Sequence, residues 1–281
     1  MPNRLRVTAI QRLCVNDGPG IRTIVFMKGC SLKCPWCCNP ETIHHDDDLY
    51  YNNGSCLYPQ NNKICRNCVL HGGKQEKEIC PLNVYTRTYD EYTSEELLNL
   101  ILKDKPLFEN DGGVTFSGGE PLIHSKLLLP ILKELKRRNI HIAYESTLFS
   151  KRKDYDEVCS FVDYWIVDLK FQYGFLPNDD YQISSSDFYE NLKDLQARKM
   201  PLKYRMVVMD DILDRVDYIA QKLISYNIYQ IELLPCHSLA EIKYRQLDKK
   251  FARYKMPSNG QMQQMSEMLK QHGIESTFLC L

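Results

Sequence analysis

From residue 112 onward, short apolar runs rich in β-branched and aromatic residues alternate with segments of helical periodicity. Apolar runs of about four to eight residues are typical of strands buried on both faces of a parallel sheet. With the earlier run RTIVFMK, they predict an α/β fold whose parallel sheet is closed or partly closed into a barrel. The expected strands are 22–28, 114–116, 140–144, 164–169, 204–208, 229–234 and a last one within 273–280, and the expected helices are 125–138, 154–161, 186–199, 212–226 and 258–272.

Two details of this pattern lead to further expectations, one about the place of the functional site and one about a helix. In parallel α/β barrels the functional groups gather at the C-terminal ends of the strands, so residues directly after each expected strand are the candidates. Pro130 lies inside the expected helix 125–138 and is expected to break or kink it early.

Residues 46–92 lie between the first expected strand and this alternation, and they form a polar, turn-rich segment that carries four cysteines. The segment has too little apolar content to build its own core, so it is either disordered or held by metal. Regular helix resumes after Thr93, which with Glu96 offers a capping box. We therefore expect a main domain of residues 1–45 and 93–281 with a Cys-rich insertion at 46–92.

Charge and composition limit the partners and the cellular compartment that we expect. Lys+Arg and Asp+Glu both total 36, so the net charge is zero and nothing favours nucleic acid as a partner. The N-terminal segment is too charged for a secretory signal, and no apolar run approaches the roughly 18 residues of a membrane span. We expect a cytoplasmic protein without a membrane partner. In a reducing compartment its twelve cysteines are not expected to form disulfides: clustered ones are candidate metal ligands, and scattered ones (Cys14, Cys159, Cys236, Cys280) are candidate core residues.

The densest cysteine cluster is KGCSLKCPWCC, directly after the strand expected at 22–28. Cys30, Cys34 and Cys37 have the spacing Cys-x3-Cys-x2-Cys, and three such thiolates can hold three corners of a 4Fe–4S cluster while the fourth iron stays open. A structural zinc site is the alternative, but it requires a fourth Cys or His, usually at paired spacing. The spacing favours the cluster, and an open cluster implies sensitivity to oxygen.

This loop resembles that of the radical S-adenosylmethionine (SAM) superfamily. NDGPGIRT at 16–23 and LPCHSLAEIKY at 234–244 are similar to signatures of its glycyl-radical-enzyme activating enzymes, such as pyruvate formate-lyase activating enzyme. The resemblance implies a partial (β/α)6 TIM-like radical SAM barrel with a Cys-rich insertion. It also implies that SAM binds the open iron and is cleaved by one electron to a 5′-deoxyadenosyl radical, which abstracts a hydrogen atom.

The resemblance assigns roles to individual residues. Cys37 rather than the adjacent Cys38 joins Cys30 and Cys34 as a cluster ligand. For Glu145 a strand-end carboxylate facing water is an equal alternative to a SAM or cation ligand. Three residues depart from the family pattern: Leu148 and Ala240 stand where glycine is expected, and Cys236 where tyrosine is. The implied SAM contacts are Trp36, Gly118, Gly119, Glu120, Glu145, Asp168, Lys170, Arg205 and His237, with a monovalent cation near SAM.

The insertion has a thiol set of its own. Four thiols suffice for a second 4Fe–4S cluster, which we favour from the resemblance to ferredoxin-like insertions; a zinc site satisfies the same count, and an insertion without metal is the third possibility. The four are Cys56, Cys65, Cys68 and Cys80.

Two functions compete. The first is an activating enzyme that removes a hydrogen atom from a glycine Cα of a partner glycyl radical enzyme, and the second is a radical SAM enzyme of the same branch that modifies another peptide or a small metabolite. A noncatalytic electron carrier is disfavoured, because it would not need an open iron together with SAM-site motifs. A flavodoxin- or ferredoxin-type electron donor and a monomeric state are expected. Cys280 is read as a core residue, with a hydrogen-donor role as the less favoured alternative.

Overall fold

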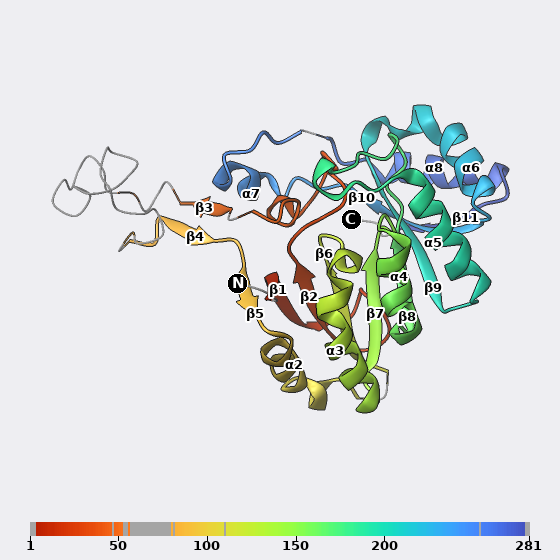
Figure 1. Cartoon of the computed structure of the whole chain (residues 1–281). Coiled ribbons are helices and arrows are strands. Elements are labelled where there is room, and N and C mark those ends of the chain that lie inside the picture. The colour runs from red at the N-terminus through yellow and green to blue at the C-terminus, as the bar shows by residue number, and fades with distance from the viewer. Residues whose placement is uncertain are drawn as a thin grey trace.

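The computed structural model describes residues 4–46, 48–52, 56, 80, 82–109, 111–252 and 254–278. Within these residues, nine strands form one sheet in the order β11-β10-β9-β8-β7-β6-β2-β1-β5 (Figure 1). The seven strands from β2 to β11 are parallel to their neighbours, whereas β1 and β5 are added antiparallel at one edge. The parallel strands are β2 (Arg22–Met27), β6 (Gly113–Gly118), β7 (His141–Ser146), β8 (Tyr164–Asp168), β9 (Leu202–Val208), β10 (Gln230–Pro235) and β11 (Glu275–Phe278), and the antiparallel ones are β1 (Leu5–Cys14) and β5 (Asp90–Tyr92).

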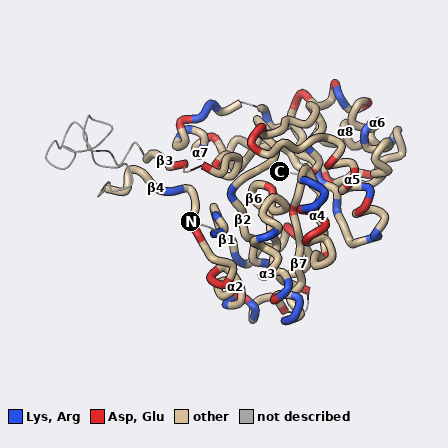
Figure 2. The backbone as a smooth tube through the Cα atoms, in the orientation of Figure 1, with Lys and Arg blue, Asp and Glu red and all other residues tan. Residues whose placement is uncertain are grey.

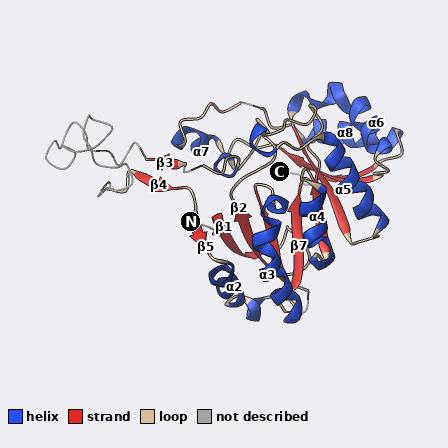
Figure 3. Cartoon of the chain, viewed as in Figure 1, coloured by secondary structure: helices blue, strands red, loops and turns tan. Residues whose placement is uncertain are grey.

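Helices follow the parallel strands and cover one face of the sheet (Figure 3). The helix α3, for example, packs its apolar side against the sheet with Leu128, Ile131 and Leu135, all fully buried. This βα series confirms the predicted α/β fold with a parallel sheet. The helices are α2 (Ser94–Leu102), α3 (Ser125–Arg137), α4 (Arg152–Val158), α5 (Ser185–Ala197), α6 (Val216–Ser225), α7 (Glu241–Gln246) and α8 (Asn259–Gln271).

Some segments of the structure were not expected from the sequence, among them β1, β5 and α7. β1 lies where charged residues interrupt the chain, and it buries only Leu5 and Val7 well, so its apolar pattern is weak. α7 has six residues and buries only Tyr244. The capping box of α2 is confirmed: the Thr93 side chain accepts from the amide of Glu96, and the Glu96 carboxylate accepts from the amide of Thr93.

The expected break at Pro130 is wrong. A 3-10 turn at Pro121–His124 leads directly into α3, which continues through Pro130 to Arg137. Proline removes the donor for the carbonyl four residues earlier, which belongs to Lys126. Both residues are on the exposed side of the helix, so water can bind the freed carbonyl.

The base of the expected insertion is a two-stranded antiparallel ribbon of β3 (Leu49–Tyr51) and β4 (Tyr85–Arg87), whereas β5 already pairs with β1 in the main sheet. Cys65 and Cys68 lie outside the described residues, so the insertion boundary and its metal stay predictions. Lys and Arg positions are interspersed with Asp and Glu positions along the backbone (Figure 2). Of the helices that the structure describes, none has the length and apolar character needed to cross a membrane.

Candidate functional site

The loops that follow β2, β6, β7 and β8 meet at one edge of the sheet, because parallel strands end on the same side. The loop after β2, residues 29–38, is called the cysteine loop here. Backbone bonds anchor its start: the amide of Gly29 donates to the carbonyl of Thr42 (2.7 Å) and that of Cys30 to Ile43 (3.0 Å). Asn178 Nδ2 also donates to the carbonyl of Cys30 (2.9 Å).

The thiols of the cysteine loop differ in their surroundings. Cys34 is buried, Cys30 and Cys37 are half-buried against the core, and Cys38 is exposed. The sulfur of Cys30 accepts from the amide of Leu32 (3.5 Å), and that of Cys37 accepts from the amide of Asn39 (3.4 Å). The structure thus turns Cys37 toward the protein and Cys38 toward solvent.

Burial raises the pKa of Cys30, Cys34 and Cys37, that of Cys34 to about 11, and the neighbouring cysteines raise the pKa values of Cys30 and Cys37 further. Buried thiolates this close together need positive charge to be stable, which is what iron ions provide. No group of three or more His, Cys, Asp or Glu side chains in the described part of the chain forms a site for a single metal ion. The donor set fits a cluster in which three irons take one thiolate each.

Gly119 lets the loop after β6 touch the cysteine loop, because a Cβ atom on Gly119 would lie 1.9 Å from the carbonyl oxygen of Gly29. The amide of the next residue, Glu120, donates to the same carbonyl (2.9 Å). Gly118 instead lies against Met27 in β2 and has a φ of 102°, which favours glycine. Gly119 therefore sets the spacing between the two loops.

Glu120 is fully buried and organises the turn after β7. Its carboxylate accepts from the Ser146 hydroxyl (2.7 Å), from the Thr147 amide (2.8 Å) and hydroxyl (2.5 Å), and from the Leu122 amide (3.2 Å). Burial raises the pKa of Glu120, and these four donors oppose that rise. In the same turn Leu148 adopts a φ of 57°, the conformation expected of glycine at that position.

Arg205 in β9 is the centre of an ion network on the side of the sheet opposite the helices. Its Nη1 donates to Glu145 Oε1 (2.9 Å) and Asp17 Oδ1 (3.1 Å), and its Nε donates to Glu232 Oε2 (2.7 Å). Ser117 Oγ donates to the other oxygen of Glu145 (2.5 Å). Burial opposes the charge of Arg205, but Glu145 and Glu232 outweigh it and raise the pKa of the guanidinium.

A cavity of about 440 Å³ adjoins this network. Strand residues of β8, β9 and β10 form one wall, and the NDGPG stretch forms the other. The lining residues are Val15, Asn16, Asp17, Gly18, Pro19, Tyr164, Ile166, Lys203, Arg205, Glu232 and Leu234.

Asp168 and Lys170 lie beneath the cysteine loop and form an ion pair of 2.5 Å. Burial opposes the charge of Lys170, but Asp168 and the nearby Cys34 raise its pKa. Several polar atoms among the described residues are buried without a hydrogen-bond partner, and they include Asp168 Oδ1, Trp36 Nε1 and Ser31 Oγ. Ser31 and Trp36 belong to the cysteine loop and Asp168 lies beside it, so these open atoms fit a polar ligand at this place.

An aromatic cluster closes one side of the cysteine loop. The Trp36 ring lies 5.4 Å from that of Tyr173 and 6.1 Å from that of Tyr254, and the Arg215 guanidinium lies 4.7 Å above Tyr173. His237 is exposed, two residues after β10.

Sequence reasoning missed several residues of this site: Tyr173, Tyr254, Asp17 and Glu232. A signal existed for Glu232, because a carboxylate inside the apolar run YQIELL needs a partner. Asp17 stood within the NDGPGIRT motif. Of the scattered cysteines, Cys159 and Cys236 are in the core as expected, Cys14 is only half-buried, and Cys280 lies outside the described residues.

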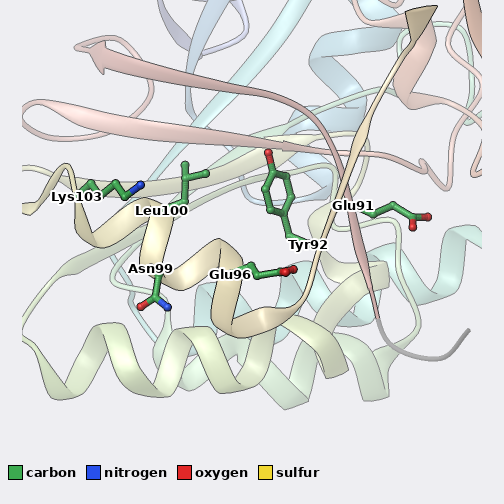
Figure 4. A pocket seen from close by; sticks show the side chains of 6 residues that line it. All are labelled: Glu91, Tyr92, Glu96, Asn99, Leu100 and Lys103. Atoms are coloured by element: carbon green, nitrogen blue, oxygen red, sulfur yellow. The ribbon is translucent and has the colours of Figure 1, made fainter.

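A second groove, of about 410 Å³, lies between β5 and α2 (Figure 4). It contains none of the candidate site residues, and both acidic and basic side chains line it. The lining residues are Glu91, Tyr92, Glu96, Asn99, Leu100 and Lys103.

Comparison with known proteins gives consistent results. Residues 16–189 match the family described as a 4Fe-4S single cluster domain. The chain is 28% identical to the 4-hydroxyphenylacetate decarboxylase activating enzyme of Clostridium scatologenes over 94% of each chain. It is 31% identical to the isethionate sulfite-lyase activating enzyme of Nitratidesulfovibrio vulgaris over 85% of this chain and 86% of the relative. The crystal structure of a radical SAM methyltransferase from Sphaerobacter thermophilus is similar in fold, with a TM-score of 0.53 at 14% identity, covering 92% of this chain and 66% of that one.

Proposed function

The chain belongs to the glycyl-radical-enzyme activating enzymes of the radical SAM superfamily, and we propose from this that it makes a glycyl radical on a partner enzyme. The observation that carries the proposal is the cysteine loop. Three inward thiols at the end of β2 lie beside buried polar atoms that have no hydrogen-bond partner, in a chain similar to activating enzymes over most of its length.

Cys30, Cys34 and Cys37 would hold the 4Fe–4S cluster. When bound, the cluster supplies the electron that cleaves SAM reductively, and the resulting 5′-deoxyadenosyl radical takes a hydrogen atom from a glycine Cα. The amides of Leu32 and Asn39 donate to two of the three sulfurs, which stabilises them as thiolates.

The groups beneath the loop would orient SAM. Lys170 and Asp168 offer a cation and an open carboxylate oxygen next to Cys34, suited to the carboxylate and amino groups of the methionine part. Trp36 with its aromatic neighbours offers a flat surface for adenine, and its free indole N–H can donate to it. Arg205 offers a second cation.

The remaining predicted contacts have less support. Gly118, Gly119 and Glu120 are engaged with the protein itself, so they would act by placing the cysteine loop and the turn after β7. His237 is exposed two residues after β10, and its contact with the ribose of SAM stays a prediction from the resemblance. The monovalent cation stays a prediction, with Asp168 Oδ1 as its best oxygen.

The defining experiment is anaerobic activation of a candidate partner. The reduced enzyme, SAM and a glycyl radical enzyme should produce a doublet spin-resonance signal on the partner, and that signal should lose its large splitting when glycine is α-deuterated. Formation of 5′-deoxyadenosine without a radical on the partner, but with a modified peptide or metabolite, would favour the second function instead.

The choice of the third cluster ligand is tested separately. Cys37→Ala should abolish reductive SAM cleavage after reconstitution, whereas Cys38→Ala should retain it, because only Cys37 is turned toward the protein. The opposite pattern would show that the assigned ligand is wrong. The flavodoxin- or ferredoxin-type electron donor, the second cluster and the monomeric state stay predictions.

A further inference from the structure

The short helix α7 lies against the cysteine loop, although more than 200 residues separate them in the chain. Lys243 Nζ donates to Asn39 Oδ1 (2.8 Å) and to Glu41 Oε1 (2.6 Å), directly after the loop. The Tyr244 hydroxyl donates to the carbonyl oxygen of Cys37 (3.1 Å). Three hydrogen bonds from two adjacent residues therefore meet the end of the loop that carries the third thiol.

Both sides of this contact are buried and make further contacts. Tyr244 is 5% exposed, its ring lies 5.2 Å from that of Phe251, and its amide donates to the carbonyl of Ala240. Glu41 is 6% exposed and forms an ion pair with Lys243. The fully buried Lys28 donates to the backbone carbonyl of Glu41 (2.8 Å) and fixes it from the opposite side.

The carbonyl that Tyr244 holds belongs to the peptide bond between Cys37 and Cys38. The two residues carry the same side chain, so the backbone path decides which thiol faces the protein. Bringing Cys38 inward in place of Cys37 would require the backbone of both residues to rearrange, and the carbonyl of Cys37 would then leave the Tyr244 hydroxyl. The hydrogen bond from Tyr244 therefore opposes that rearrangement.

We propose that Lys243 and Tyr244 are positioning residues that hold the cysteine loop so that Cys37, and not Cys38, is presented to the cluster. This inference rests on the cluster assigned to the loop under the proposed function, and it gives the KY pair of LPCHSLAEIKY a physical role. It does not depend on which substrate loses the hydrogen atom.

The first test uses the full-length, metal-free protein under native conditions. Alkylation by iodoacetamide is followed at each cysteine by peptide mass spectrometry. In the wild type, Cys38 should react faster than Cys37. In Tyr244→Phe, which removes only the hydroxyl, the Cys37 rate should rise roughly three- to tenfold, the population change expected for the loss of one hydrogen bond.

Two controls distinguish a local change at Cys37 from an opening of the whole fold. Cys159 is 3% exposed and remote in sequence, so its labelling rises only if the whole fold opens. Tyr229→Phe, at a tyrosine that is 50% exposed, is the matched control and should change neither rate. An unchanged Cys37 rate in Tyr244→Phe, or an equal rise at Cys159, would overturn the proposal.

The second test loads the cluster and reads its reduced spin-resonance spectrum. Tyr244→Phe should show a second signal from chains ligated through Cys38, and adding Cys38→Ser should remove that signal. A single spectrum equal to the wild type would overturn the proposal even if alkylation changes. Lys243→Met should act in the same direction, and Tyr244→Phe decides the matter if that variant does not fold. Neither test needs a glycyl radical, so both remain informative if the proposed reaction is wrong.

Discussion

Leu148 offers a sharp test of the site's architecture. It stands where glycine is expected in the family, yet it is fully buried and keeps the turn with a φ of 57°. Its amide donates to Ser146 Oγ (2.9 Å), and its carbonyl accepts from Asn191 Nδ2 (3.1 Å). Packing and hydrogen bonds together hold a leucine in a conformation that favours glycine.

The two opposing contributions can be estimated. The left-handed conformation costs a residue with a Cβ roughly 1–2 kcal/mol. Truncating a buried leucine to alanine costs about 2–5 kcal/mol. Leu148→Ala loses the packing and keeps the strain, whereas Leu148→Gly loses the packing and relieves the strain. We therefore expect both variants to be less stable than the wild type, with the glycine variant about 1 kcal/mol more stable than the alanine variant.

The control is Leu192, which is 1% exposed inside α5. In a helix interior glycine is about 1 kcal/mol less favourable than alanine, so the order of the two variants should reverse there. Urea unfolding of the four variants measures both differences. If glycine is the less stable substitution at position 148 as well, the backbone strain inferred for Leu148 does not exist.

Further predictions follow from the same site. Replacing all three proposed ligands in the cysteine loop by alanine should leave about four irons per chain if the insertion holds its own cluster, and zinc or no metal on analysis would contradict this. Arg205→Lys should lower unfolding stability by about 2–4 kcal/mol in urea and weaken SAM binding in calorimetry, because one ammonium cannot serve three carboxylates placed around a guanidinium. Burial lowers the pKa of His124 from 6.5 to about 4, so the neutral imidazole is favoured in the folded state. The free energy of unfolding should therefore fall as the pH drops from 6.5 toward 4, by roughly 2 kcal/mol at pH 5. Urea unfolding at several pH values measures this dependence, and His124→Gln should make it weaker.

The sequence predicted the elements whose signal is local. Each buried parallel strand is a short apolar run, and the cysteine loop places its three thiols within eight residues, so neither needs long-range information. The partners of Arg205 could not be found in this way: Asp17 lies 188 residues away, and nothing local says that the first loop reaches β9. α7 was missed for a related reason, because a six-residue helix stabilised by contacts with the cysteine loop has little periodicity of its own.

The ion network of Arg205 limits how the proposed site can take up SAM. The guanidinium already bonds Glu145, Glu232 and Asp17, so a substrate carboxylate can reach it only if one of them withdraws. Glu145 lies in β7 and Glu232 is paired in register with Arg205, so both of these carboxylates come from the sheet itself. Asp17 comes from the loop between β1 and β2, and burial together with Glu145 raises its pKa, which disfavours its charge. We therefore expect Asp17 to be the partner that withdraws if Arg205 takes the SAM carboxylate. Because Asp17 also lines the adjoining cavity, its withdrawal would link occupancy of the SAM site to the wall of that cavity.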